Sequence, residues 1–443
     1  ISTSGDYSVL TEAGGNAVQY KNIENLTVGS YAYTEIMDPN DSSKKLGALW
    51  NSSEKVLHLY GGANLGTQSI VGSTGSGGGL SGLTSSSGLT VVGSSSGDYM
   101  NLNINRSDNG SDSYLSGDYS LAMGSGSDSI LVKLKNGDSI DMGGGDDTVS
   151  LAYMGSYGTP AIGSASFAKL DGGLGNDTLN FGSSATTDQV LTLSIGGAVN
   201  FENISGSMAK ETLQGDSGAN KLAGDDGLDV IYGYGGDDQL AAGSWSVFNA
   251  SDSSRILSSV NDSNNNDNDT LYGGAGNDLL YGSTGDNTLD GGTGTDIIYS
   301  GNGSDTIVIR SGDGSATLAN ADVVKDFSDG NDVLGMASVS FDDLTIAQGS
   351  GSYASHTLIS VTSTGEYLAI LENVSASNII TTNITASGNI SASEAIHTDL
   401  IFGNGTLNIN PNRNGLVFSG NTHTLQVYGG IKAGTSTGTS HFF

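Results

Sequence analysis

The chain has 443 residues, of which 15 are Lys or Arg and 47 are Asp or Glu, so its formal net charge at pH 7 is −32. Phosphate backbones are bound by basic surfaces, and this balance therefore excludes nucleic acid as an expected partner. With 69 Gly, three Pro and no Cys, long helices are not expected, and disulfide bonds, thiolate metal sites and cysteine nucleophiles are excluded.

The first 115 residues are the least informative part of the chain. Residues 1–60 contain alternating segments such as Val56-Leu57-His58-Leu59-Tyr60, which predict a small amino-terminal β region that includes Trp50. Residues 61–115 are rich in Gly and Ser and carry apolar pairs such as Val91-Val92. We interpret them as degenerate solenoid coils that no longer bind metal.

Residues 116–182 contain the first Gly-Asp turns that are followed by short apolar segments. The clearest reads Gly172-Gly173-Leu174-Gly175-Asn176-Asp177-Thr178-Leu179, while weaker copies place Asp128 before Ile130 and Asp147 before Val149. For the weaker copies, a metal-binding turn and a metal-free turn are equally good interpretations.

A regular period begins in residues 183–243. Asn220, Asp229 and Asp238 follow one another at nine-residue steps, and an apolar residue lies two positions after each of them. Residues 244–266, with Trp245 and Phe248 in a polar run, interrupt the period. An insertion of this length predicts a loop that leaves one face of a solenoid.

The longest unbroken register lies in residues 267–308. Its acidic or amide position falls, at nine-residue steps, on Asp269, Asp278, Asn287, Asp296 and Asp305. Two of the units read Gly273-Gly274-Ala275-Gly276-Asn277-Asp278 and Gly291-Gly292-Thr293-Gly294-Thr295-Asp296.

These residues resemble the calcium-binding nonapeptide of the RTX family, Gly-Gly-x-Gly-x-Asp followed by x-apolar-x. The resemblance implies an all-β chain folded as a parallel β-roll or β-solenoid with calcium-binding turns, flanked by small β-rich terminal regions. Each nonapeptide would supply one turn and one short strand, and two would make one coil. Several calcium ions are the implied cofactor. Glycine permits positive φ in tight turns, and turn carbonyls and Asp carboxylates supply the oxygens that calcium needs.

The candidate metal-ligating residues are the acidic or amide residue of each unit and glycines of the turns. They are Asp128, Asp147, Asp177, Asn220, Asp229, Asp238, Asp269, Asp278, Asn287, Asp296, Asp305 and Asp332, with Gly172, Gly175, Gly227, Gly273, Gly276, Gly291 and Gly294. Because Asn keeps an oxygen but removes a charge, the sites at Asn220 and Asn287 are expected to be weak or only partly formed.

With two units per coil, turns on one edge recur every 18 residues. One predicted column therefore holds Asp269, Asn287 and Asp305, and the other holds Asp278 and Asp296. In the earlier run Asn220 pairs with Asp238, and Asp229 lies on the opposite edge. The apolar positions should form an inward ladder of Leu271, Leu280, Leu289, Ile298 and Ile307, while Tyr281 and Tyr299 should stack on one outer face.

Residues 309–380 are expected to form a capping flank. The segments 322–327 and 329–334 resemble the flank that closes RTX arrays, and an open solenoid end would expose unpaired strand groups. Asp322, Asp326 and Asp332 are either a further calcium site or a solvated turn.

Residues 381–443 change character. The alternating runs 383–393 and 407–410 loosely resemble the carboxy-terminal repeats of tail-fibre and virion structural proteins of marine bacteriophages. This resemblance implies a fibre-like tail that serves assembly or attachment. A plain β-rich extension explains the pattern equally well.

No motif indicates catalysis or a membrane span. The five His residues never approach the His-Glu-x-x-His spacing of zinc proteases. Residues 93–97 and 434–438 fit Gly-x-Ser-x-Gly, but both lie in Ser/Gly-rich sequence without the strand-to-helix context of a nucleophile elbow. No apolar run approaches the roughly 18 residues of a membrane-spanning helix. The chain is therefore not expected to be an enzyme.

The sequence predicts a non-enzymatic extracellular structural protein. It would be a calcium-stabilised subunit of a surface coat, an S-layer-like lattice or a fibre, on a cell or a virion, with copies of itself or other surface subunits as partners. One alternative is a bacteriophage fibre or decoration protein. Another is a calcium-dependent adhesin that binds surface glycan through residues 244–266 or the Tyr281/Tyr299 face. A secreted RTX hydrolase with its catalytic domain in the first 115 residues is the least favoured interpretation.

Overall fold

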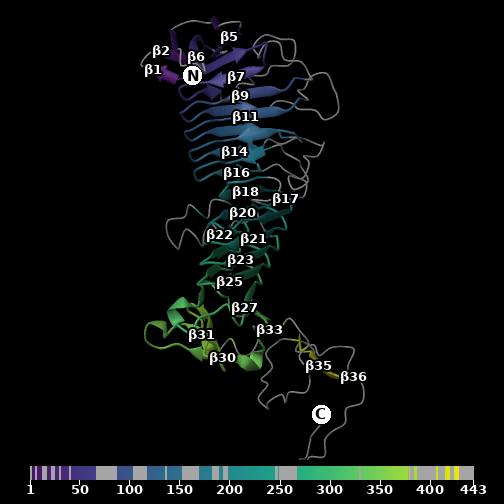
Figure 1. Cartoon of the computed structure of the whole chain (residues 1–443). Helices are drawn as coiled ribbons and strands as arrows, with labels where there is room; N and C mark the ends of the chain where they lie inside the picture. The colour runs from purple at the N-terminus through teal and green to yellow at the C-terminus, as the bar shows by residue number, and fades with distance from the viewer. Residues whose placement is uncertain are drawn as a thin grey trace, which may run out of the picture.

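The chain winds into a long stack of short strands (Figure 1). The computed structural model describes residues 2–4, 7–11, 17–20, 25–28, 31–38, 41–65, 87–102, 117–134, 137–151, 169–181, 189–192, 198–244, 248, 267–328, 331–377, 379, 384–386, 406–407, 415–419 and 424–428. Within these residues, no helix is long and apolar enough to cross a membrane.

One 14-stranded sheet, here called the long sheet, runs along the stack. In spatial order it contains β8 (Asn64–Leu65), β10 (Tyr99–Leu102), β12 (Ser129–Val132), β14 (Thr148–Leu151), β16 (Thr178–Asn180), β18 (Asn203–Ser207), β20 (Lys221–Asp225), β22 (Gln239–Ala241), β24 (Leu279–Tyr281), β26 (Ile297–Tyr299), β28 (Asp322–Val324), β32 (Tyr367–Leu371), β31 (Thr357–Val361) and β30 (Leu344–Gln348). Its strands pair in parallel from β8 to β32.

Two eight-stranded sheets hold the strands that alternate with those of the long sheet along the chain. The first contains β4 (Asn25–Val28), β5 (Tyr31–Asp38), β6 (Asp41–Asn51), β7 (Val56–Leu59), β9 (Leu89–Val92), β11 (Tyr119–Ala122), β13 (Ser139–Asp141) and β15 (Lys169–Asp171). The second contains β17 (Gln189–Thr192), β19 (Glu211–Gln214), β21 (Val230–Gly235), β23 (Thr270–Ala275), β25 (Thr288–Thr293), β27 (Thr306–Arg310), β29 (Val333–Ala337) and β33 (Ile384–Ala386). Each coil thus gives one strand to each side, and the predicted all-β parallel β-roll is confirmed.

The remaining elements lie outside this alternation. They are β1 (Ser2–Ser4), β2 (Tyr7–Thr11) and β3 (Ala17–Tyr20), β34 (Thr406–Leu407), β35 (Gly415–Ser419) and β36 (Thr424–Tyr428), and the short 3-10 helices η3 (Leu318–Asn320), η4 (Phe341–Asp343) and η5 (Gly351–Tyr353). β1–β3 and β34–β36 form separate three-stranded antiparallel sheets.

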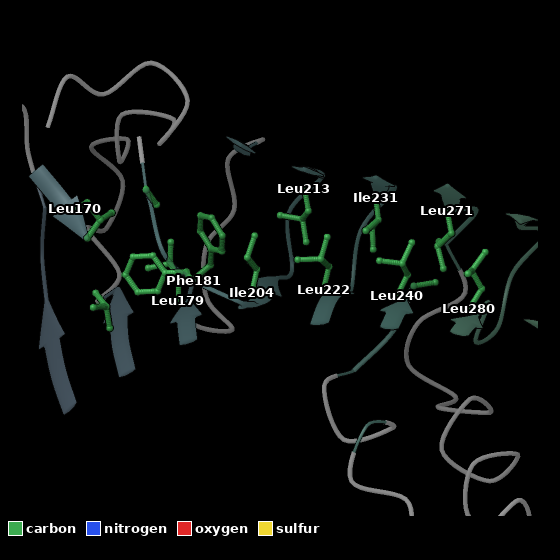
Figure 2. Packing of buried hydrophobic residues seen from close by; sticks show 14 of the residues in the cluster. Leu170, Leu179, Phe181, Ile204, Leu213, Leu222, Ile231, Leu240, Leu271 and Leu280 are labelled. Carbon is green, nitrogen blue, oxygen red and sulfur yellow. The ribbon is translucent and has the colours of Figure 1, made fainter. Parts of the chain in front are cut away.

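Apolar side chains from the two facing sheets fill the space between them. In β23, β24, β25 and β26 the second residue of each strand is buried. Figure 2 shows Leu213, Ile231 and Leu271 from one side facing Leu222, Leu240 and Leu280 from the other. The predicted ladder Leu271, Leu280, Leu289, Ile298 and Ile307 continues this row, fully buried. Each short strand gives few side chains to this interior. A coil therefore depends on the coils beside it to cover its apolar side chains.

The insertion predicted at 244–266 does not interrupt the strand pairing of the stack. The strands that flank it pair directly, Val230 with Thr270 and Leu240 with Leu280. Of the insertion itself the structure describes Ser244 and Phe248; Trp245 lies outside the described residues.

Phe248 corrects the prediction for Tyr281 and Tyr299. The two rings do stack, with centroids 5.4 Å apart, but they are only 3% and 7% exposed. The Phe248 ring approaches Tyr281 edge-on at 6.2 Å, and Ala223 and Ala241 pack beside the pair. The predicted outer tyrosine face is therefore a second small core that the insertion covers.

Both ends of the stack gain antiparallel strands. At the amino-terminal end, β5, β6 and β7 pair antiparallel before β7 joins β9 in parallel, and Trp50 is buried among them. At the other end, β30, β31 and β32 form an antiparallel meander, whose β32 pairs in parallel with β28. The meander covers part of the edge that an unfinished solenoid would expose. The runs 387–405, 408–414 and 429–443 of the predicted tail lie outside the described residues.

The width of the core gives a first prediction. Replacing Leu280, which is fully buried, by Ala should lower the free energy of unfolding by about 2–5 kcal/mol, because the cavity cannot be filled from a second core layer. Urea unfolding followed by circular dichroism measures this. Leu174→Ala is the control: this side chain is 80% exposed in a turn, and its loss should change stability by less than about 0.5 kcal/mol. Equal effects of the two variants would contradict the assigned core.

Candidate metal centre

Each coil places an acidic side chain immediately before a strand, and these side chains stack into two columns. In the column beside the long sheet, Oδ1 of each Asp accepts a hydrogen bond from the backbone N–H of the column residue one coil earlier. The acceptors are Asp128, Asp147, Asp177, Asp238, Asp278 and Asp296, at N···O distances of 2.6–2.8 Å. The bond between Asp278 and Asp296 places them in the same column, as the 18-residue period predicts.

The second column lies beside the other sheet and uses the same bond. Oδ1 of Asp229 accepts from Glu211 N–H, and the chain of bonds continues through Asp269, Asn287 and Asp305 to Asp332. The insertion does not interrupt it, since Asp229 N–H reaches Asp269 across 40 residues of sequence. The turns therefore remain stacked in register even where the chain between them is longer.

The second carboxylate oxygen behaves differently. Among the described residues, Oδ2 of nine column aspartates is buried and has no hydrogen-bond partner: Asp128, Asp147, Asp177, Asp229, Asp238, Asp269, Asp278, Asp296 and Asp305. A buried polar group without a partner is costly, and each one in a native structure calls for an explanation. Nine at one repeated position indicate that another group completes these turns.

The glycine that opens each turn makes room for this oxygen. A Cβ at Gly273 would lie 2.4 Å from Asp278 Oδ2 and 2.4 Å from the carbonyl oxygen of Gly291 in the next coil. The same relation joins Gly233 to Asp238 Oδ2 at 2.2 Å and Gly291 to Asp296 Oδ2 at 2.3 Å. Carboxylate and carbonyl oxygens thus converge with no donor between them. An all-oxygen ligand set of this kind suits Ca²⁺.

The predicted glycines occupy two kinds of turn position. Gly172, Gly273 and Gly291 lie beside the Asp Oδ2 of their own turn. Gly175, Gly227, Gly276 and Gly294 have positive φ between 132° and 149°. At Gly294 a Cβ would also come within 1.7 Å of the carbonyl oxygen of Gly276, so no other residue fits there.

Burial shifts the titration of the column carboxyls upward. The pKa rises to about 6 for Asp147, Asp177 and Asp278, to about 7 for Asp128, Asp238, Asp269 and Asp296, to about 8 for Asp305 and to about 9 for Asp229. Desolvation is the largest cause at each, and neighbouring carboxylates add to it at most of them, for example Glu211 and Asp269 around Asp229. Without metal, burial therefore moves the titration of these carboxyls toward neutral pH, and Asp229 and Asp305 favour the protonated form there.

Three predicted ligands differ from the rest. Asn220 Oδ1 accepts from the backbone N–H of Asp216, at 2.9 Å. Asn287 turns its amide nitrogen toward the carbonyl oxygens of Gly282 and Gly285, at 2.5 and 3.2 Å. Asp332 bonds through both oxygens, Oδ1 to Asp305 N–H and Oδ2 to Ser328 N–H. None of the three has an unpartnered side-chain oxygen.

The cap is also closed by hydrogen bonds. Asp326 accepts from the N–H groups of Ser300 and Gly301, at 2.7 and 3.0 Å, and Asp322 Oδ1 accepts from Asp296 N–H. Asp332 is fully buried. The solvated turn proposed for Asp322, Asp326 and Asp332 is therefore wrong, because their carboxylates serve as acceptors for the last coils of the stack.

Sequence reasoning missed several column residues. Asp98 and Glu202 occupy the same position before β10 and β18, and Glu211 is the first residue of β19. Glu202 Oε2 accepts from Asp177 N–H as an aspartate would. Each has an apolar residue two positions later, Met100, Ile204 and Leu213. That signal was available, but the varied spacing hides the nine-residue period.

A cation in these turns would depend on the backbone. Among the described residues, no group of three or more His, Cys, Asp or Glu side chains is placed to hold a metal ion. Each of the nine aspartates offers a single unpartnered oxygen. The remaining ligands would be carbonyl oxygens of stacked turns, such as that of Gly291.

The Gly-x-Ser-x-Gly sequence at 93–97 forms one of these turns. It connects β9 to β10, two strands, and its Ser94 donates N–H and Oγ to Asp98, at 2.9 and 3.1 Å. The geometry is that of a solenoid turn rather than a strand-to-helix elbow. The second such sequence, 434–438, lies outside the described residues.

A comparison with known structures finds an extracellular lipase, LipA from Serratia marcescens, with 13% sequence identity and a TM-score of 0.23. The similarity covers 68% of this chain and 40% of the lipase, so this chain spans less than half the length of that protein. At this level of similarity nothing of the lipase's activity is transferred. No curated protein matches the chain.

The family comparison bears directly on the turns. The sequence model described as "RTX calcium-binding nonapeptide repeat (4 copies)" matches residues 169–186, 206–244, 264–298, 272–307 and 281–314. These stretches hold both columns from Asp177 to Asp305. Asp128 and Asp147 fall outside the matches, although the structure places them in the same column. RTX repeats bind calcium, and proteins that carry them are typically secreted and extracellular. The chain therefore carries RTX calcium-binding nonapeptide repeats in a parallel β-roll.

Proposed function

We propose that the chain is a non-enzymatic extracellular structural protein, a calcium-stabilised subunit of a surface coat, lattice or fibre on a cell or a virion. One observation carries the proposal: unpartnered carboxylate oxygens recur along both sides of an elongated stack of coils (Figure 1). The turns are repeated structural elements rather than a single reactive centre. A role distributed along the whole roll is mechanical, and it fits a component that gives a surface its shape.

Calcium would act on the turns as a counter-charge. The residues that would hold it are the column aspartates through Oδ2, together with turn carbonyls such as that of Gly291. A bound ion supplies two positive charges between stacked carboxylates that otherwise repel one another. Because the unfolded chain lacks these assembled turns, binding to them stabilises the folded state.

The described histidines support a structural role. His58 lies on β7, where burial lowers its pKa. His356 accepts the N–H of Asn373 through Nδ1 and packs edge-on against Tyr353. Both have local structural roles. His397, His423 and His441 lie outside the described residues.

One of the two glycan-binding surfaces of the adhesin alternative is buried. Tyr281 and Tyr299 are covered, so glycan cannot reach their faces without displacing Phe248. The other surface, residues 244–266, is described only at Ser244 and Phe248. The structural role therefore rests on more of the chain than the glycan-binding role does.

The raised carboxyl pKa values predict how pH acts on the calcium-free protein. Between pH about 4 and pH about 9 the folded chain binds more protons than the unfolded chain, since the column pKa values of about 6 to about 9 exceed the ordinary 3.8. In that window the free energy of unfolding falls as pH rises. We expect a lower melting temperature at pH 8.5 than at pH 5.5 without calcium.

Saturating calcium should reverse or flatten this dependence, because the ion must displace the protons and binds best to ionised carboxylates. Thermal melts at the two pH values, with and without calcium, measure both slopes. A calcium-free protein that gains stability with rising pH across this range would show that the column carboxyls are ionised in the fold.

Assembly tests the structural role. Electron microscopy of the purified chain should show ordered sheets or fibres with millimolar calcium and none with chelator. Circular dichroism of the same samples separates loss of assembly from loss of folding. Folded, dispersed monomers in calcium would contradict self-assembly, and glycan and host-surface binding would then be the functions to test.

A further inference from the structure

Of the column turns without an unpartnered oxygen, five share a further feature. They are the turns that end at Asp98, Glu211, Asn220, Asn287 and Asp332, and each is closed by a hydrogen bond within the turn. They occupy the same positions in the stack as the nine open turns. The difference therefore comes from the side chains of each turn.

Four of the five use the same closing bond. The backbone N–H four residues before the column residue donates to its side chain: Ser94 to Asp98, Ser207 to Glu211, Asp216 to Asn220 and Ser328 to Asp332, at 2.6–3.1 Å. In these turns an N–H group points toward the carboxylate or amide oxygen. An N–H donor in that place satisfies the oxygen. It also repels a cation, because the donor hydrogen carries a partial positive charge.

Asn287 closes its turn differently. Its Oδ1 accepts the N–H of Asp269 at 2.8 Å, which identifies the other terminal atom as the nitrogen. That nitrogen donates to the carbonyl oxygens of Gly282 and Gly285. The amide thus donates to two backbone oxygens of its own turn.

The turn of Asp278, in the opposite column, provides the comparison. Gly273 precedes Asp278 by five residues, as Gly282 precedes Asn287. At each glycine a Cβ would approach the side chain at the end of the turn, Oδ2 of Asp278 at 2.4 Å or Nδ2 of Asn287 at 3.3 Å. The atom in this place is an unpartnered acceptor in the first turn and a bonded donor in the second.

We propose that the amide of Asn287 takes the place of a calcium ion, and that the five closed turns fold without one. The proposal rests on calcium binding by the open turns, as proposed above. It assigns the ions to two calcium-dependent blocks, one with Asp128, Asp147 and Asp177, the other from Asp229 to Asp305. Asn287 is an ion-free turn inside the second block.

The other four closed turns lie where a block begins or ends. Asp98 precedes the first block, Glu211 and Asn220 separate the two, and Asp332 follows the second. Each can stay ordered without calcium and present a formed coil to its neighbour. Since a solenoid coil is stabilised by the coils beside it, these turns are templates on which the open turns order when calcium arrives.

Reciprocal substitutions test the proposal. Asn287→Asp should create an open turn, so that the chain binds one calcium ion more than the unmodified protein and melts at a lower temperature in chelator. Asp278→Asn should allow the amide to bond the turn carbonyls, so that the chain binds one ion fewer and melts at a higher temperature in chelator. Equilibrium dialysis with elemental analysis counts the ions, and circular dichroism gives the melts.

Asp286→Asn is the matched control. It removes the same charge as Asp278→Asn, but Asp286 is exposed and its Oδ1 accepts the N–H of Ser304. This variant should leave the ion count unchanged. A calcium count that Asn287→Asp does not raise, in a protein that binds calcium, would overturn the inference. An unmodified protein that binds no calcium at all would instead overturn the proposed function.

Discussion

The hydrogen bond from a backbone N–H to the carboxylate of the next coil determines the rest of the structure. It fixes the rise from coil to coil and orients each carboxylate, with Oδ1 toward the neighbouring coil and Oδ2 toward its own turn. Asp278 and Asp296 show the bond at 2.8 Å. Once Oδ1 is used in this way, Oδ2 is left buried. The requirement for a counter-charge therefore follows from the way the coils are stacked.

The length of the repeat explains why the core is narrow. A nine-residue unit contains both a turn and a strand, so its strands are short, three residues in β24 and six in β25. Each of these two strands gives one apolar side chain, Leu280 or Leu289, to the central core. A narrow interior gives each coil limited apolar burial, so stability has to be supplied at the edges as well. The turns and the core therefore both contribute to the stability of the roll.

The resemblance of the turns to the RTX nonapeptide predicted the parallel roll, and with it the nine-residue period predicted the inward ladder and the two columns around Asp269 and Asp278. The period failed upstream because the column residues Asp98, Asp128 and Asp147 are separated by 30 and then 19 residues. Coils of unequal length keep the stack but destroy the period. The burial of Tyr281 could not be predicted, because it depends on Phe248, which lies in an insertion that has no periodicity. The orientation of the Asn287 amide could not be predicted either, because it depends on which neighbouring N–H donates to its oxygen.

The acidic composition also has a different meaning once the columns are known. Nine of the 47 acidic residues direct a carboxylate oxygen into buried turns, so their charge does not contribute to the outer surface in the ordinary way. Burial favours their protonated form, and an ion would favour the ionised form, so the charge of the interior depends on pH and calcium together. A net charge of −32 counted from the sequence therefore describes the unfolded chain better than the folded one. In this protein the excess of aspartate is explained first by the structure of the turns, and only second by the charge of the surface.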